Sequence, residues 1–372
     1  MNKHILYLAA CVLIASMAAC NDDDEINVKR EYPDNEIPER AAPDFALGAD
    51  PSWVTEMESA NWTFRDADGN EGDCLAILKS VGFNACRLRV WVNPSDGYCN
   101  TADMVRKAVR AYNLGYSIMV DFHYSDSWAD PSQQHKPSVW DGCTSVDDLS
   151  EKLYKYTKKV LTSVRTNGVD VAWVQIGNET LGGMMQDNSD GSASDVNGKM
   201  GPNYAKLHKA GCKAAKEVFP KCKTIVHFEN GQNMTNLTYG LNQLKDNGAE
   251  FDILGVSLYP NLTEENWYAT YVRTPINNLN NIHNTFGCDV MICEVGCDIS
   301  NANAKTALND IVVRCKTDVP SCKGVFYWEP ECYDPGNGAW QGYGMGGFNA
   351  NGSPSEALIN AFSGKATTLM GK

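Results

Sequence analysis

The sequence Val171-Ala-Trp-Val-Gln-Ile-Gly-Asn-Glu179 decides the interpretation of the chain, because an apolar, strand-like run ends here in a carboxylate. The same arrangement recurs at Asp289-Val-Met-Ile-Cys-Glu294. A carboxylate that closes a buried strand must face a partner or a ligand, since an unpaired charge cannot be left in a dry interior. Two such carboxylates that meet across one pocket can break a glycosidic bond by displacement with retention.

Short apolar runs alternate with amphipathic, helical segments such as Thr101–Leu114 and Val146–Thr166. Eight strand-then-helix units, with strands buried on both faces, predict an α/β fold in which a single (β/α)8 TIM barrel closes. The competing open, doubly wound sheet is disfavoured, because no glycine-rich phosphate loop follows the first run. The predicted strands are Phe45–Ala49, Phe83–Trp91, Ser117–Phe122, Val171–Gly177, Thr224–Phe228, Phe251–Ser257, Asp289–Glu294 and Gly324–Trp328.

Active sites of such barrels lie where strands end and the following loops begin, and both glutamates fall there, on the fourth and seventh strands. We expect Glu179 to be the general acid/base and Glu294 the nucleophile, which requires the two carboxyls to lie about 5–5.5 Å apart. The amide of Asn178 could donate to the sugar hydroxyl beside the anomeric carbon. The structural alternative for Glu179 is a loop residue paired with a surface lysine.

Other polar residues at predicted strand ends could support this chemistry. Arg87 and Arg89 alternate on one strand face, so either could hold Glu294 ionised, and Tyr259 could hydrogen-bond the same carboxylate. His123 lies in Asp121-Phe-His-Tyr-Ser-Asp126 and could bind a sugar hydroxyl or orient Glu179, although a lone histidine is often structural.

Aromatic residues at strand ends have two possible roles. Trp91, Trp128 and Trp328 could stack on the apolar faces of sugar rings or belong to the core. The loops Met184–Asn203 and Glu329–Ser353 could form the walls of a cleft or be idle surface insertions.

The N-terminus has the features of an exported lipoprotein. Residues 1–19 combine a positive start with an apolar stretch too short to span a bilayer, which predicts a signal peptide. Cys20 ends a lipoprotein-like cleavage box and would carry the lipid, unless it is a chance cysteine behind an ordinary signal. Residues 20–43 predict a flexible acidic tether and 44–372 a single catalytic domain. We therefore expect a protein anchored to the outer membrane, with its domain at the cell surface.

Charge and cysteine content limit the possible partners. The formal net charge of −14 disfavours nucleic acid and suits a neutral polymer. No two cysteines have the C-x-x-C spacing typical of zinc sites, so a zinc site is disfavoured. Twelve of the fourteen cysteines follow Cys20, which predicts disulfides in an exported protein. Cys315 could pair with Cys322 and Cys212 with Cys222, whereas Cys86 and Cys293 lie in strand-like runs as core thiols.

Several sequence blocks resemble glycoside hydrolase family 53. They are Gly48-Ala-Asp50 with Trp53, Arg87-Leu-Arg-Val-Trp-Val-Asn-Pro94, Asp121-Phe-His-Tyr-Ser-Asp126, Val174-Gln-Ile-Gly-Asn-Glu179 and Phe326-Tyr-Trp-Glu-Pro330. The resemblance covers residues 45 to 360 and implies a retaining endo-β-1,4-galactanase that acts on pectic galactan, with Glu179 as acid/base and Glu294 as nucleophile. Asp50 and His227 complete the candidate substrate-binding set, and we expect a monomer.

The chain also departs from the family pattern. Leu181 stands where the family commonly has tryptophan, Asn261 follows Tyr259-Pro where Trp is usual, and Val295-Gly-Cys replaces Thr-Ala-Tyr. These differences leave chain-length preference open. Some family members bind calcium near the last loops; no oxygen-rich signature indicates it here, so we expect no cofactor and leave calcium open. The alternatives are a mannanase- or glucanase-type barrel glycosidase and a non-catalytic surface glycan-binding lipoprotein.

Overall fold

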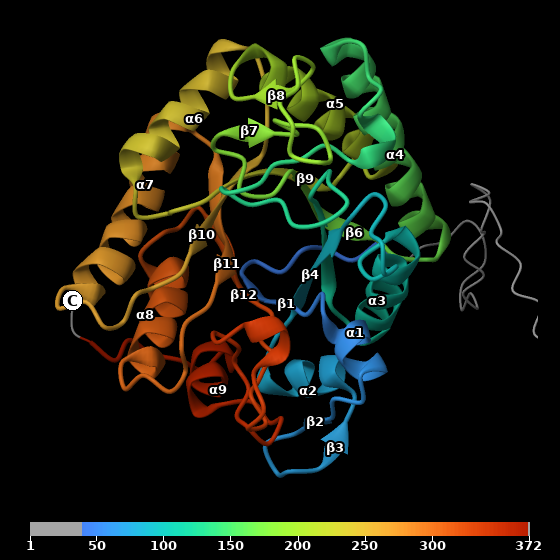
Figure 1. Ribbon diagram of the computed structural model, residues 1–372. Helices are drawn as coiled ribbons and strands as arrows, with labels where there is room; N and C mark the ends of the chain where they lie inside the picture. The colour runs from blue at the N-terminus through green and yellow to red at the C-terminus, as the bar shows by residue number, and fades with distance from the viewer. Residues whose placement is uncertain (1–38, 371–372) are drawn as a thin grey trace, which may run out of the picture.

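The computed structural model describes residues 39–370 of the 372-residue chain. Within this range eight parallel strands close into a barrel in the order β1-β12-β11-β10-β9-β6-β5-β4, and helices surround it (Figure 1). The predicted (β/α)8 barrel is therefore confirmed. The barrel strands are β1 (Ala46–Asp50), β4 (Ala85–Val90), β5 (Ser117–Phe122), β6 (Val171–Ile176), β9 (Lys223–Phe228), β10 (Ile253–Leu258), β11 (Asp289–Val295) and β12 (Cys322–Trp328).

The helices connect successive strands around the outside of the barrel (Figure 1). They are α1 (Val54–Ser59), α2 (Cys74–Val81), α3 (Thr101–Asn113), α4 (Val146–Thr166), α5 (Pro202–Val218), α6 (Met234–Asp246), α7 (Thr274–Phe286), α8 (Ala304–Thr317) and α9 (Glu356–Phe362). Shorter elements lie in the loops: β2 (Phe64–Arg65), β3 (Glu71–Gly72), β7 (Gly183–Met184), β8 (Gly198–Lys199), η1 (Ser138–Trp140), η2 (Ala269–Arg273) and η3 (Trp340–Gly342).

Polar caps explain where several helices begin. The Asn100 side chain accepts a 2.9 Å hydrogen bond from the backbone of Asp103 at the start of α3. Ser145 accepts one of 3.1 Å from Asp148 at the start of α4. Such caps satisfy amide groups that have no partner within the helix. The caps place the starts of α3 and α4 at the predicted residues.

Alternation along the strands builds the barrel interior in layers. The lower layer is apolar and takes one or two residues from every strand: Ala46, Ala85, Met119, Trp173, Ile225, Ile253, Met291, Cys293 and Phe326. Side chains two positions further along a strand point to the same side. Two residues past Ala85, Met119 and Trp173 come Arg87, Asp121 and Gln175, so the interior becomes polar toward the carboxyl ends of the strands.

Strand β11 carries an irregularity that matters for the site. Val256 of β10 pairs with Ile292, but the next residue, Ser257, pairs with Glu294 instead of Cys293. An extra residue on one strand is a β-bulge, which re-aims the following side chain. Cys293 belongs to the lower, apolar layer of the barrel interior, and the bulge allows its neighbour Glu294 to face the interior as well.

The two long loops follow β6 and β12, at the carboxyl ends of the barrel strands, as expected. The first contains the small β7–β8 ladder, in which Gly183 pairs with Lys199. It also contacts the loop after β5, where His135 forms a β-bridge with Asp187. Their role as cleft walls stays a prediction.

Of the predicted N-terminal regions, the signal peptide and Cys20 lie outside the described residues, as does most of the tether. Arg40, near the tether's predicted end, contacts the barrel domain: its guanidinium donates to the carbonyls of Tyr112 and Tyr116 at 2.8 and 2.7 Å. Across residues 39–370, no helix combines the length and apolar character required to cross a bilayer.

The twelve cysteines of the described range are all free thiols. The pairings expected for Cys315 with Cys322 and for Cys212 with Cys222 are therefore not seen, although the thiols of Cys315 and Cys322 are in hydrogen-bonding contact. Cys293 is fully buried in the inner layer, in agreement with its prediction as a core thiol. Cys86 is likewise buried.

Candidate active site

Glu294 lies near the carboxyl end of β11 and is only 4% exposed. Its Oε1 lies 2.9 Å from Nη2 of Arg87, and its Oε2 accepts a 2.7 Å hydrogen bond from the hydroxyl of Tyr259. Burial raises the pKa of Glu294 above its ordinary value, and Arg87 and the Tyr259 hydroxyl offset part of that rise. Both partners favour the ionised carboxylate, which is the form that a nucleophile needs.

Arg87 is fully buried and gathers the polar groups around Glu294. Its guanidinium also lies 2.5 Å from Oδ2 of Asp50 and 3.0 Å from Oδ2 of Asp121. Its Nε donates to Oε1 of Gln175 at 3.0 Å. The planar fork of arginine can serve several acceptors at fixed angles, so this residue sets the positions of groups on four strands.

Glu179 lies just past β6 with a φ of 49°, in the left-handed region, and its side chain is half-buried. The pKa of Glu179 is raised to about 8, mainly by burial and next by the negative charge of Glu294. Glu229 and Asp130 add smaller contributions in the same direction, and a hydrogen bond from Ser257 opposes them. The charge of Glu294 therefore affects the protonation of Glu179, which holds its proton near neutral pH.

Asn178 is 5% exposed and is fixed by two elements. Its Oδ1 accepts from Nη2 of Arg87 at 2.8 Å, and its Nδ2 donates to the carbonyl of Ala129 at 2.8 Å. An amide NH2 has two hydrogens, so one remains for a further acceptor. The structure thus leaves Asn178 able to make the sugar contact predicted for it.

His227 is fully buried beneath Asn178 and Glu179. Its Nδ1 lies 2.9 Å from Oδ1 of Asn178 and 3.3 Å from the backbone nitrogen of Glu179, and its Nε2 lies 3.0 Å from Oγ of Ser257. Burial lowers its pKa well below the ordinary value, so the ring is neutral. With protein partners at both nitrogens, His227 supports Asn178 and Glu179 from behind.

His123 likewise has protein partners at both ring nitrogens. Its Nδ1 accepts from the indole of Trp91 at 3.0 Å and from the backbone of Ala129 at 3.3 Å. The ring proton must therefore sit on Nε2, which lies 3.1 Å from Oδ2 of Asp121. His123 fixes the orientation of Trp91 and of the loop after β5.

Arg89 does not contact Glu294 but pairs with the carboxylate of Glu329 at the end of β12. Its guanidinium lies over three indole rings, 4.6 Å from the centroid of Trp128 and 5.2 Å from those of Trp53 and Trp91. Such stacking stabilises a buried cation. Of the two arginines, Arg87 contacts Glu294, the predicted nucleophile, whereas Arg89 lies among aromatic residues.

The aromatic group extends to side chains that reach the surface. Trp328 and Trp128 are half-buried, with ring centroids 5.8 Å apart, and Tyr343 from the last loop lies 4.7 Å from Trp328. Trp53 and Trp91 lie deeper, at 5% and 7% exposure. Of the predicted stacking residues, Trp328 is thus better placed to meet a ligand than Trp91.

Sequence reasoning did not single out Gln175, Ser257 or Glu329. Gln175 and Ser257 lie inside strands and carry no charge that would mark them. Glu329 follows a strand just as Glu179 and Glu294 do, and this shared position could have identified it as a buried partner.

A metal was left open from the sequence. Donor atoms of Glu329, Glu331 and Cys332 lie within 4.8 Å of one another in the described chain. Calcium prefers six to eight oxygen ligands. This buried group contributes a thiol, and Arg89 already neutralises Glu329. The donor set does not fit calcium.

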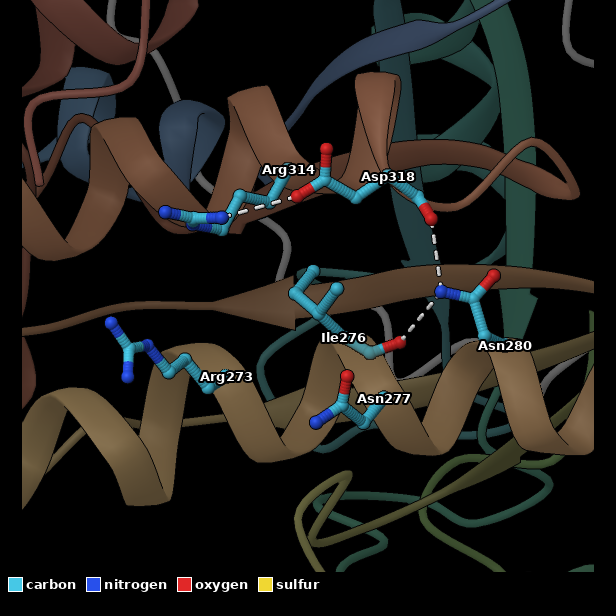
Figure 2. A pocket seen from close by; sticks show the side chains of 6 residues that line it. All are labelled: Arg273, Ile276, Asn277, Asn280, Arg314 and Asp318. Carbon is cyan, nitrogen blue, oxygen red and sulfur yellow. Dashed lines mark hydrogen bonds and ion pairs between the residues drawn. The ribbon is translucent and has the colours of Figure 1, made fainter. Parts of the chain in front are cut away.

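A separate cavity of about 400 Å³ lies between α7 and α8 (Figure 2). Asn280 donates to the carbonyls of Ile276 and Asp318 at its edge, and Arg314 pairs with the carboxylate of Asp318 at 3.1 Å. These contacts join the two helices. None of the candidate catalytic residues lines the cavity.

A (β/α)8 barrel with one glutamate at the end of its fourth strand and another at the end of its seventh has the architecture of a glycoside hydrolase. The model of glycosyl hydrolase family 53 matches residues 46–362, and the chain belongs to this family.

Several known proteins and solved structures are similar to this chain. A probable arabinogalactan endo-beta-1,4-galactanase A of Neosartorya fischeri is 32% identical over 76% of this chain and 83% of its own length. An endo-beta-1,4-galactanase of Bacillus subtilis is 29% identical over 82% of this chain and 76% of its own length. Among solved structures, a fungal beta-1,4-galactanase superposes with a TM-score of 0.73 at 26% identity, covering 85% of this chain and 98% of its own. The family 53 catalytic domain of Ignisphaera aggregans gives 0.72 at 26% identity, over 87% of this chain and 97% of its own.

Proposed function

We propose that the protein is an endo-acting, retaining glycoside hydrolase that cleaves β-1,4-galactan by double displacement. Its family and its similarity to galactanases support the substrate. The observation that carries the proposal is the interaction between Glu179 and Glu294, in which the charge of one raises the pKa of the other. Glu179 holds its proton, and Arg87 and Tyr259 offset part of the burial that raises the pKa of Glu294, so the pair can supply both the acid and the nucleophile.

In the first step Glu179 is the acid. Its proton passes to the glycosidic oxygen while the bond from that oxygen to the anomeric carbon breaks. The carboxylate of Glu294, held by Arg87 and Tyr259, forms a bond to the same carbon. The products are a galactosyl ester on Glu294 and a shortened chain that leaves with a new hydroxyl group.

In the second step Glu179, now ionised, is the base. It removes a proton from water, the water oxygen bonds to the anomeric carbon, and the ester bond to Glu294 breaks. Two inversions at one carbon give net retention. Glu179 regains its proton, and both groups return to their starting states.

Substrate contacts belong to the residues that combine exposure with position. We assign the stacking platform to Trp328, with Trp128 and Tyr343 beside it, and the hydroxyl contact to Asn178. Asp50, Arg87, Arg89 and His227 then act from behind this surface. Leu181, in place of the usual tryptophan, changes the contacts next to Glu179 and thereby the preferred chain length.

A mannanase- or glucanase-type activity is the competing enzymatic reading, and glycan capture without cleavage is the non-enzymatic one. Incubation of the purified protein with β-1,4-galactan, mannan and β-glucan separates all three. Short oligosaccharides from galactan alone, first released as the β-anomer in proton NMR, support the proposal. Binding without products, or products from mannan or glucan instead, would refute it.

We propose further that the protein is a monomer anchored to the outer membrane through a lipid on Cys20, facing the cell surface. The signal-like residues 1–19 and the acidic run after Cys20 support this. Full-length protein in a Gram-negative host should incorporate a fatty-acid analogue, and C20A should not. Equal labelling of both forms would exclude the anchor.

Export would also expose the thiols to an oxidising compartment, where the Cys315 and Cys322 thiols, already in contact, could form a disulfide. Mass mapping of the exported protein without reductant should find the peptides of Cys315 and Cys322 linked. Two free thiols in that preparation would rule the pairing out.

A further inference from the structure

The backbone at Glu179 needs support from outside its own strand. Its φ of 49° lies in the left-handed region, which residues other than glycine seldom adopt. A proton donor must also keep its carboxyl within about 2.6–3.2 Å of the oxygen it protonates. The peptide groups on either side of Glu179 therefore have to be fixed.

Gln134 supplies such support from the loop that follows β5. Its side chain is 5% exposed, and its Nε2 donates to the carbonyl of Asn178 at 2.8 Å and to that of Glu179 at 3.2 Å. The backbone carbonyl of Gln134 accepts a 2.6 Å hydrogen bond from the backbone nitrogen of Gln186, which ties this part of the loop to the loop after β6. The side-chain amide then spans two successive peptide carbonyls.

We propose that Gln134 is a positioning residue for the general acid/base Glu179, an inference that rests on the role proposed for Glu179 above. By binding the carbonyls before and after this residue, Gln134 fixes the peptide planes from which the Glu179 side chain projects. Loss of that hold lets the carboxyl drift from the glycosidic oxygen. Displacements of about 1 Å can cost about 100-fold in rate.

Lys136 provides a matched structural comparison within the same loop. It is 1% exposed, and its Nζ donates to Oγ of Ser194 at 2.7 Å and to the carbonyl of Val196 at 3.1 Å. It therefore ties the loop after β5 to the loop after β6 without touching the carbonyls beside Glu179. If Gln134 only packed the loop, its replacement should affect the two substrates in the same way as replacement of Lys136.

The test compares Q134M, K136M and E179A on two substrates: β-1,4-galactan and a dinitrophenyl β-galactobioside. The aryl leaving group needs no proton, so a misplaced acid lowers kcat/KM, which reports the first step, only for the polysaccharide. Q134M should lose about 10- to 100-fold in kcat/KM on galactan and less than about threefold in kcat/KM on the aryl substrate. K136M should change both rates by the same factor. E179A should show the strongest leaving-group dependence.

A second variant protects the test against misfolding of Q134M. Q134E keeps the side-chain size and can donate to the carbonyls only as the neutral acid. Its galactan rate relative to the wild type should therefore recover as the pH falls. Suppose that E179A loses more activity on galactan than on the aryl substrate. Equal losses on both substrates in Q134M, or a pH-independent deficit in Q134E, would then overturn the inference. If E179A itself lost both activities equally, the proposed role of Glu179 would fail instead.

Discussion

Glu179 and Glu294 are the same amino acid in two environments, and the difference between those environments is the basis of their roles. Glu294 has a guanidinium and a phenol at its two oxygens, which favour the charged form. Glu179 has no cation at that distance among its described neighbours and three acidic groups nearby, which favour the neutral form. Chemistry at this site therefore depends on Arg87 as much as on the glutamates.

The pH dependence of turnover should report the acid form of Glu179. Its pKa is raised to about 8, so kcat/KM on galactan should fall as the pH rises through about 8, where the proton is lost. An aryl galactobioside with a good leaving group needs no such proton, and its rate should persist at higher pH. The measurement is a pair of pH–rate profiles. Identical alkaline limbs for the two substrates would contradict the assignment.

Replacement of Arg87 should damage both stability and catalysis. R87M leaves three buried carboxylates without their cation, which should destabilise the fold by about 3–5 kcal/mol. Surviving enzyme should need a higher pH for activity, because Glu294 loses a group that lowers its pKa. The measurements are thermal unfolding and the acid limb of the rate profile.

Arg65 gives the control for that change, since it pairs with Glu71 at the surface. Exposed pairs contribute about 0–1 kcal/mol, so R65M should unfold nearly as the wild type does and keep its acid limb. Equal destabilisation by the two substitutions would mean that the charges around Arg87 are not a coupled network.

At the scale of elements, strand β11 shows what a sequence can and cannot predict. Its apolar run and terminal glutamate identify the strand and its end. The bulge that turns both Cys293 and Glu294 inward depends on register against β10 and β12, which no local pattern encodes. Partners from other loops, such as Gln134, could not be predicted from the sequence for the same reason. They are neutral residues that only the tertiary fold brings next to Glu179.

Strand β12 leads into a second pair of acids whose charge affects stability. Glu331 is fully buried; burial raises its pKa well above the ordinary value, and the charge of Glu329 raises it further. The folded state therefore holds a proton that the unfolded chain releases above about pH 4.5. Stability should be complete below that pH and decline as the pH rises toward the folded-state pKa.

The neutral, similarly sized variant E331Q should remove that decline. Its melting temperature should match the wild type near pH 5 and exceed it near pH 8. E151Q, which alters an exposed pair with Lys155, should leave the pH dependence of melting unchanged. Parallel pH curves for the wild type and E331Q would show that Glu331 is not the buried acid described here.

For the whole molecule, the barrel determines which distant residues can cooperate. Closure of the sheet brings the ends of β6 and β11 to one face, although Glu179 and Glu294 are far apart in sequence. The eight-strand rhythm made this arrangement predictable, because buried parallel strands end at a common face. The described residues contain free thiols where disulfides were predicted, and cysteine count alone could not distinguish paired cysteines from buried thiols.

The most direct test of the central claim is to trap the covalent intermediate. A 2-deoxy-2-fluoro galactobioside with a good leaving group slows both steps, and a reactive aglycone allows the first to proceed. Mass mapping of the inactivated enzyme should place a single glycosyl ester on the peptide containing Glu294, and E179A should still form it. A label on another residue, or turnover with inversion and no label, would contradict the account.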